Sequence, residues 1–457
     1  MERRNAWLSY KEAEEAEMEK LAKAYREFLD KGKTERECVA EIVKEAEATG
    51  YESLESKIKK GEKIKAGDKV YAVGMKKIIA LFHVGYEELS GGMSILCAHI
   101  DSPRLDVKQN PLYEDTDLVY LDTHYYGGVK KYQWVTLPLA MHGVVAKKDG
   151  SVVEVSIGED EEDPVLYITD LLIQKKAAEV IEGEKLDILI GSRPLADLPD
   201  DKKKDAVKQN VLNILNEKYG IEEEDFLSAE LEIVPAGKAR DCGLDRSMIA
   251  AYGQDDRVCA YTSLAAMLEM KETPKRTGCC LLVDKEEIGS VGATGMQSRF
   301  FENSVAELLD GMGCYSELAL RRALRNSSML SSDVSAGYDP AYAEAFEKKN
   351  AAYLGRGIVL NKFTGARGKS GSNDANAEYV ARVRRIFDDH DVAFQTAELG
   401  KVDFGGGGTI AYIAALYGME VIDSGVAVLS MHAPWEVTSK ADVYEAYKAY
   451  KAFLLDA

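Results

Sequence analysis

The sequence has few cysteines, and their spacing excludes the folds that cysteine usually builds. There are seven in 457 residues, an odd number with no CxxC pair and no zinc-finger spacing. Most lie inside apolar stretches, so we expect buried, reduced thiols and a cytoplasmic protein. They are Cys38, Cys97, Cys242, Cys259, Cys279, Cys280 and Cys314.

Two further absences restrict the partners. No run reaches the roughly 18 apolar residues of a membrane helix, and the N-terminus leads into a charged helical pattern. Basic residues are also outnumbered, with 58 Lys and Arg against 78 Asp and Glu, so the formal charge is −20. An acidic surface repels phosphate backbones and anionic lipids, so we expect neither nucleic acid nor a membrane as partner. The 46% of hydrophobic residues predicts a large globular core.

The hydrophobic pattern predicts an α/β protein with a mostly parallel central sheet. Helical segments alternate with short, continuously apolar runs, which are typical of strands buried on both faces. The expected helices are 11–29, a second from a capping box at 34–37 to Gly50, 257–270, one opened by Asp339-Pro340, and one beginning at Ser439. The expected strands include 69–73, 77–84, 93–100, 279–283 and 425–431.

The middle of the chain has a different texture. Between residues 104 and 244 alternating strand patterns such as 152–157 and 229–234, turn clusters and the charged stretch 200–205 dominate. We expect a separate α+β domain inserted there. The main domain would then be discontinuous, formed by residues 1–103 and 245–457.

Three of the buried-strand patterns end in groups that can bind a metal. His99 follows one, Glu286-Glu287 another, and His432 a third. In open parallel sheets, ligands bind beyond the carboxyl ends of the strands, where the loops converge. Each piece alone has a simpler explanation, such as a helix cap for Asp255 or an Asx turn for Asp333. Their joint placement favours a metal site.

The residue types also indicate which chemistry the site performs. Imidazoles and carboxylates without cysteine suit zinc or a similar divalent ion in a catalytic site. Many carboxylates for few histidines predict two ions that share a bridging acid. One carboxylate must remain to take a proton from water, and the diverging side chains of Glu286 and Glu287 allow one to bind metal while the other acts as base. Asp101 is placed to orient the His99 ring.

A nucleotide-binding protein is the alternative. Residues 363–370 look like a phosphate-binding loop, but Phe363 stands where the first glycine belongs, and the preceding apolar strand is short. The glycine run 405–408 lacks the dinucleotide-binding spacing. We expect a glycine such as Gly407 to let the backbone approach a substrate or turn tightly. Taken by themselves, His124 and His142 read as structural histidines.

Five segments together resemble the aspartyl aminopeptidase family, whose members are dinuclear zinc aminopeptidases. The matches occur in family order and extend over nearly the whole chain. The segments are residues 99–104, 254–257, 284–290, 332–333 and 430–434.

The resemblance implies a hydrolase that removes N-terminal residues from peptides. It implies a phosphorylase/hydrolase-like α/β catalytic domain, a smaller inserted dimerisation domain, and dimers that assemble into a tetrahedral dodecamer. It also implies two divalent ions per subunit, with zinc expected and cobalt or manganese as alternatives. Asp255 would bridge the ions, Glu286 would be the general base and Asp101 would steady His99. The implied metal ligands are His99, Asp255, Glu287, Asp333 and His432.

Substrate recognition is less defined by the resemblance. A histidine from a neighbouring subunit reaches the active site in this family, and His142 is the best positional match. A basic group that reads acidic N-terminal side chains would be Lys369, Arg367 or Lys362. The chain departs from the family by extra glycine and lysine in 362–373, and by Asp256 where an asparagine is usual. Both acidic and apolar N-terminal residues therefore remain open as substrates.

Overall fold

The computed structural model describes residues 4–170, 181–196, 204–367, 370–403 and 406–457. The chain forms two compact units. The first comprises residues 1–101, 239–431 and 436–457, and the second comprises 102–238 and 432–435. Within the described ranges, no helix combines the length and apolar character needed to cross a membrane.

The first unit is built on a nine-stranded sheet whose centre is parallel. Strands β13, β4, β14 and β18 lie next to one another and all run in the same direction, whereas β3 and β16 pair antiparallel with this group. The expected mostly parallel sheet is therefore confirmed. In order, the strands are β1 (Glu52–Ser53), β2 (Lys69–Gly74), β3 (Ile78–His83), β13 (Thr277–Val283), β4 (Met93–His99), β14 (Ser328–Ser331), β18 (Glu420–Gly425), β16 (Ile358–Asn361) and β17 (Phe394–Thr396).

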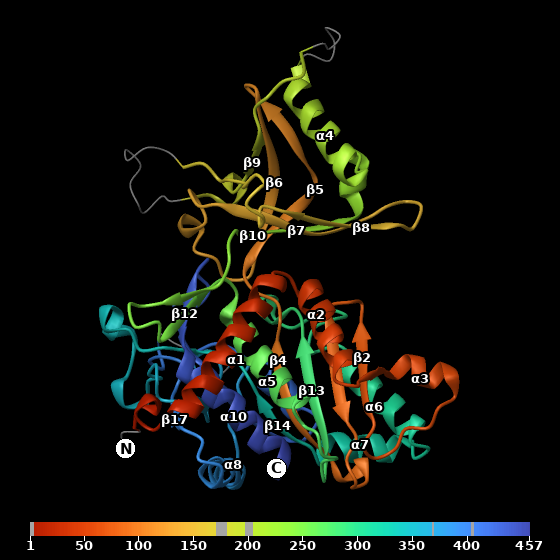
Figure 1. The fold of residues 1–457 in the computed structure, drawn as a ribbon, viewed down its shortest axis with the longest axis vertical. Helices are drawn as coiled ribbons and strands as arrows, with labels where there is room; N and C mark the ends of the chain where they lie inside the picture. The colour runs from red at the N-terminus through yellow and green to blue at the C-terminus, as the bar shows by residue number, and fades with distance from the viewer. Residues whose placement is uncertain (1–3, 171–180, 197–203, 368–369, 404–405) are drawn as a thin grey trace. The chain divides into compact units, whose positions relative to one another are not determined.

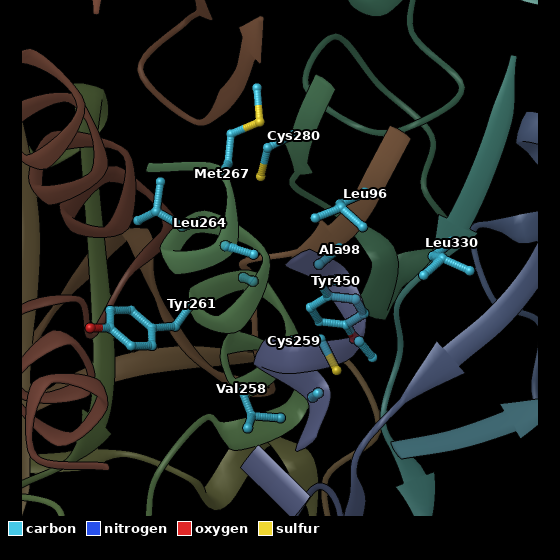
Figure 2. Close-up of a cluster of buried hydrophobic side chains, with 14 of the residues drawn as sticks. Leu96, Ala98, Val258, Cys259, Tyr261, Leu264, Met267, Cys280, Leu330 and Tyr450 are labelled. Atoms are coloured by element: carbon cyan, nitrogen blue, oxygen red, sulfur yellow. The ribbon is translucent and has the colours of Figure 1, made fainter. Parts of the chain in front are cut away.

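Both faces of this sheet are covered, which explains why its central strands are apolar throughout. Along β4, Leu96 and Ala98 belong to one core, and Ile95 and Cys97 to the opposite one. Figure 1 shows α1, α5 and α10 in front of the central strands, and Figure 2 shows α5 packing Cys259 and Leu264 into the first core. The helices of that core are α1 (Glu12–Lys31), α2 (Glu35–Ala48), α5 (Gln254–Leu268), α8 (Ala377–Asp389) and α10 (Lys440–Asp456), and those of the other are α3 (Leu54–Lys60), α6 (Phe300–Gly311), α7 (Glu317–Arg325) and α9 (Ala411–Ala415).

The predicted helix starts are largely confirmed. The Thr34 side chain accepts the backbone N–H of Glu37, and the Glu37 carboxylate accepts that of Thr34, so the capping box forms. Ser439 is the N-cap of α10. The helix expected at Asp339-Pro340 is only a short 3₁₀ segment, Pro340–Ala345, because Tyr342 leaves helical geometry at φ −129°.

The strand predicted over 425–431 is wrong. β18 ends at Gly425, and the chain then forms β19 (Ala427–Leu429) in a different sheet. A side chain at Gly425 would place its Cβ 1.8 Å from the Asp333 carbonyl oxygen, so this close crossing of backbones requires glycine. The second sheet has the order β11 (Arg240–Cys242), β12 (Met248–Ala251), β20 (Glu436–Ser439), β19 and β15 (Ser335–Ala336).

The second unit is an antiparallel α+β unit. Its sheet has six strands, and every described pairing is antiparallel. The predicted strands 152–157 and 229–234 are confirmed as β8 and β10, whereas most of the charged stretch 200–205 lies outside the described residues. The order is β8 (Val152–Ile157), β7 (Leu139–Ala146), β10 (Ala229–Pro235), β5 (Arg104–Asp115), β6 (Leu118–Tyr126) and β9 (Ile188–Gly191), with α4 (Ala206–Tyr219).

Candidate metal centre

Two neighbouring strand ends bring the central residues of the site together. β4 and β13 are parallel, and Val283 lies opposite His99 in their register. His99 is the last residue of β4, and Glu286 and Glu287 begin the short 3₁₀ turn that follows β13. Lys285, at φ 69°, turns the chain into that segment. The pairing of β4 with β13 therefore fixes the backbone positions from which the side chains of His99, Glu286 and Glu287 extend.

Side chains from three segments of the first unit converge on His99. Its Nε2 atom lies 3.2 Å from Oδ1 of Asp255 and 3.9 Å from Oδ1 of Asp333. The three residues offer ligand atoms within 4.8 Å of one another, as do His99, Glu286 and Glu287. One imidazole nitrogen among several carboxylate oxygens is a donor set that zinc accepts. These residues therefore fit a metal ion.

The electrostatics of the cluster favour a cation. Burial raises the pKa of Asp333 well above its usual range, and the negative charges of Glu286 and Asp256 raise it further. Burial lowers the pKa of His99, but hydrogen bonds to Asp101 and Asp255 outweigh this effect and leave it well above its usual value. Acids crowded away from water repel one another, and a divalent ion between them removes that repulsion.

Asp101 connects the histidine to the glutamate turn. Its two carboxylate oxygens each accept a backbone N–H at 3.1 Å, one from Glu286 and one from Glu287. The same carboxylate lies 3.2 Å from Nδ1 of His99. An ionised carboxylate only accepts, so Nδ1 donates a proton to Asp101, and Nε2 is the ring nitrogen that would bind a metal ion. A single side chain thus sets the tautomer of the imidazole and the position of both glutamates.

Asp255 and Asp256 open α5 but do not cap it. The N-cap is Gly253, the backbone is non-helical at both aspartates, and the peptide bond between them is cis. The Asp255 N–H donates to Oε2 of Glu436 at 3.0 Å, and the His99 N–H donates to Oδ2 of Asp256 at 3.3 Å. The simpler explanation of Asp255 as a helix cap is therefore wrong.

Sequence reasoning did not identify Asp256 or Glu436 as parts of this site. Asp256 stood next to a candidate ligand, and its complete burial is visible only in the folded chain. Glu436 has no motif of its own. It reaches Asp255 because β20 pairs with β12, a pairing that the local sequence does not encode.

His432 belongs to the second unit and follows β19 by three residues. It therefore does not end a strand of the nine-stranded sheet, as the sequence had suggested. Its Nδ1 lies 3.2 Å from the carbonyl oxygen of Gly128 in the same unit. A carbonyl can only accept, so Nδ1 donates its proton, and in the neutral ring Nε2 carries the lone pair that a metal requires.

The basic candidates for substrate recognition are in different environments. Lys362 is paired with Asp374 at 2.6 Å, and its Nζ lies 4.0 Å from the centre of the Phe363 ring. Arg367 is exposed at φ 51°. Lys369 lies outside the described residues. Gly407 accepts the N–H of Gly365 at 2.9 Å through its carbonyl oxygen, so it joins two loops.

The two histidines in the strands of the second unit differ in exposure. His142 is buried, and its Nε2 lies 3.3 Å from Oε1 of Glu159. His124 is exposed and stacks on Tyr125 with ring centroids 5.7 Å apart. A buried, carboxylate-paired ring agrees with the structural role first expected for His142.

The segment that resembles a phosphate-binding loop lacks the helix that such a loop needs. The strand before it, β16, ends at Asn361, and the next helix, α8, begins only at Ala377. Residues 370–376 are all described, and none of them is helical. A phosphate loop delivers its backbone N–H groups at a helix N-terminus, so the geometry does not favour a nucleotide site.

Comparison with known proteins identifies a family of zinc metalloproteases. Residues 28–454 match the family model described as "Aminopeptidase I zinc metalloprotease (M18)". The chain is 61% identical over 460 residues to a probable M18 family aminopeptidase 1 from Clostridium acetobutylicum, which covers 99% of this chain and 98% of that protein. A relative with the same description from Thermotoga maritima is 47% identical over 464 residues, or 99% of each chain.

Solved structures give the same result. The crystal structure of the M18 family aminopeptidase from Thermotoga maritima has a TM-score of 0.94, with 46% identity and 100% of both chains covered. The structure described as the S. cerevisiae mApe1 dodecamer has a TM-score of 0.76 at 21% identity, covering 94% of this chain and 95% of that one. At that identity the second likeness shows the fold alone.

Proposed function

The chain belongs to the M18 family of zinc metallo-aminopeptidases, and on that premise we propose how its residues divide the work of removing N-terminal residues from peptides. The observation that carries the proposal is the convergence of Asp255 and Asp333 on Nε2 of His99. Two zinc ions per subunit, held by five ligands, account best for so many acids in one place. The proposed ligands are His99, Asp255, Glu287, Asp333 and His432, with Asp255 shared by both ions.

Glu286 is the proposed general base. When bound, zinc lowers the pKa of a water molecule and polarises the scissile carbonyl. Glu286 would take a proton from the attacking water and pass it to the departing amine. Asp101 supports this role, because its carboxylate holds the backbone N–H of Glu286 and aligns the His99 ring.

Recognition of the N-terminal side chain is assigned to the loops that carry Lys362, Arg367, Lys369 and Gly407. Lys362 is paired with Asp374. To bind an acidic substrate side chain, Lys362 would have to exchange the Asp374 carboxylate for that of the substrate. Arg367 has a more exposed position. Acidic and apolar N-terminal residues both remain candidate substrates. For His142 to reach a neighbouring subunit, it would have to leave Glu159.

The assembly is the remaining part of the proposal. We propose that the second unit mediates dimerisation and that dimers form a dodecamer, as the description of the S. cerevisiae structure states for that protein. Analytical ultracentrifugation tests this, because a monomer or dimer at micromolar concentration would contradict it. A cytoplasmic location remains a prediction.

One experiment tests the chemistry. Aminoacyl-4-nitroanilides with acidic and apolar residues are assayed with the purified protein, and bound zinc is counted by mass spectrometry. We expect chelator-sensitive hydrolysis, two zinc ions per subunit, and recovery with zinc, cobalt or manganese. Full activity with a single ion per subunit would contradict the dinuclear proposal, and inactivity on every substrate after zinc is restored would contradict exopeptidase function.

A further inference from the structure

The turn that carries Glu286 and Glu287 is the first part of a closed loop, residues 284–297, all of which the structure describes. Asp284 is the first residue of this loop and directly follows β13. Thr294 lies across the loop from it, and both residues are buried, with exposures of 0% and 2%. Neither of them is among the proposed metal ligands.

Two hydrogen bonds join Asp284 to Thr294. The Asp284 N–H donates to the Thr294 carbonyl oxygen at 3.2 Å, and the Thr294 hydroxyl group donates to Oδ2 of Asp284. Gly295 forms a parallel bridge with Asp284 beside these bonds. Without the hydroxyl group, Oδ2 would keep only the ammonium group of Lys285, 3.4 Å away. A buried carboxylate is costly without hydrogen bonds, so this hydroxyl group helps to hold the end of β13 against the returning part of the loop.

The backbone on either side of the two glutamates has conformations that need support. Lys285 at φ 69° and Ser290 at φ 60° both lie in the left-handed region, which residues with a side chain seldom adopt. The Ser290 N–H donates to the Lys285 carbonyl oxygen at 2.6 Å, so the turn closes between them. Such residues persist where the surrounding structure holds them. The bonds between Asp284 and Thr294 hold the chain directly before Lys285.

The proposed general base is therefore supported from two directions. Asp101, which follows β4, accepts the N–H of Glu286 at 3.1 Å. From the other side, Thr294 holds Asp284, two residues before Glu286. A general base must lie within hydrogen-bond reach of the water that it activates, and a small displacement of a catalytic group lowers the rate strongly.

We propose that Asp284 and Thr294 are positioning residues, and that the hydrogen bond between their side chains holds Glu286 where it can take a proton from the attacking water. This inference rests on the proposed function, in which Glu286 is the base. It predicts that loss of the Thr294 hydroxyl group lowers kcat for acidic and apolar substrates alike, while KM and bound zinc stay as in the wild type.

The test compares Thr294→Val, which loses the hydroxyl group, with Thr294→Ser, which keeps it. In Thr294→Val we expect kcat to fall at least about tenfold, with KM within about twofold of the wild type and with unchanged zinc content by mass spectrometry. Hydrogen–deuterium exchange of the backbone of residues 284–297 is a readout that does not depend on turnover. It should be faster in Thr294→Val than in the wild type, both with zinc and after its removal. Thr294→Ser should match the wild type in kcat and in exchange.

Thr277→Val is the matched control, because Thr277 begins the same strand, β13, at its opposite end. The Thr277 hydroxyl group is also buried, and its oxygen accepts the Gly85 N–H at 3.0 Å. This variant should lower Tm and leave both kcat and the exchange of residues 284–297 unchanged.

Three results would overturn the proposal. They are wild-type kcat in Thr294→Val, an equal fall of kcat in Thr277→Val, and loss of zinc from Thr294→Val, since the hydroxyl group would then act on stability or on the metal and not on the base. If Thr294→Val does not fold, Thr294→Ala decides by the same criteria. An inactive, zinc-loaded wild type would instead contradict the proposed function.

Discussion

The metal cluster and the two loops proposed to recognise the substrate, which follow β16 and β17, are held in place by different means. The cluster begins at the ends of β4 and β13, where strand register fixes His99 and the start of the glutamate turn. The loops span the gaps after β16 and β17. The Asn373 side chain of the first loop donates to the Val421 carbonyl oxygen of β18 at 3.1 Å, and the Gly365 N–H donates to the Gly407 carbonyl oxygen of the second loop at 2.9 Å. Backbone ladders are shared among many residues, whereas each of these loop contacts is a single hydrogen bond.

The difference indicates which substitutions should change turnover and which should change substrate preference. A residue of the cluster acts on every substrate equally, because each peptide has the same amine and scissile bond. In the proposed function, a residue of the loops acts on the side chain that distinguishes one peptide from another. Substitutions in the cluster should therefore lower turnover uniformly, and those in the loops should alter preference.

The largest expected effect is that of Glu286→Gln. The amide cannot accept a proton from water, so kcat should fall by about 10²–10⁴-fold for acidic and apolar substrates alike, with zinc content near wild type. Steady-state kinetics and metal analysis measure both. The exposed Glu307→Gln in α6 is the control and should retain full activity. Ordinary turnover by Glu286→Gln would refute the assignment of the base.

The next effect is loss of metal in Asp333→Ala. Removal of a proposed ligand should reduce bound zinc from two ions toward one per subunit and lower kcat/KM by more than about a hundredfold, since even outer partners of metal ligands cost 10–100-fold. Metal analysis after gel filtration gives the stoichiometry. If two ions remain bound, Asp333 is not a ligand. If kcat/KM of Asp333→Ala fell only for acidic or only for apolar substrates, the cluster would also influence substrate preference, contrary to the distinction drawn above.

Asp101→Asn should have a smaller effect of about 10–100-fold on activity or zinc affinity. The amide presents N–H groups where Asp101 now accepts the N–H groups of Glu286 and Glu287, so it disturbs the turn and the His99 tautomer together. Zinc titration with a competing chelator measures the affinity. Asp442→Asn is the comparison, because that buried carboxylate also accepts two backbone N–H groups, but at the start of α10. Equal zinc affinities in the two variants would show that Asp101 does not support metal binding.

The sequence predicted the residues of the metal cluster better than those of the loops, because strand ends have a local signal in the sequence and contacts between loops do not. Continuous apolar runs mark buried parallel strands, and groups at their ends must gather at one edge, so His99, Glu286 and Glu287 could be found by pattern. The course of the chain at Gly425 could not, because it depends on the backbone of Asp333, 92 residues earlier. Strand β18 was not predicted, and Asn373, which contacts its Val421 carbonyl oxygen, carries no motif. Contacts between distant loops have no local signal in the chain.

The smallest predicted effect concerns His83, which belongs to neither the metal cluster nor the loops. It should change the stability of the protein and leave its catalysis unchanged. His83 ends β3 opposite Gly278, near the start of β13 rather than at its catalytic end. Burial and the charge of Lys69 lower the pKa of His83 from 6.5 to about 4. Between these values the unfolded chain binds more protons than the folded chain, so stability falls as the pH drops from about 6.5 to 4. The loss is at most about 3.4 kcal/mol, since each pKa unit corresponds to 1.36 kcal/mol. The free energy of unfolding of His83→Gln, measured with denaturant, should fall less across this pH window than that of the wild type. The exposed control His124→Gln should behave like the wild type. The ratio of kcat/KM for acidic and apolar substrates should stay unchanged in His83→Gln. Equal slopes in all three proteins would show that His83 does not contribute. A changed substrate ratio would mean that substrate preference responds to the stability of the whole sheet and not to the loops alone.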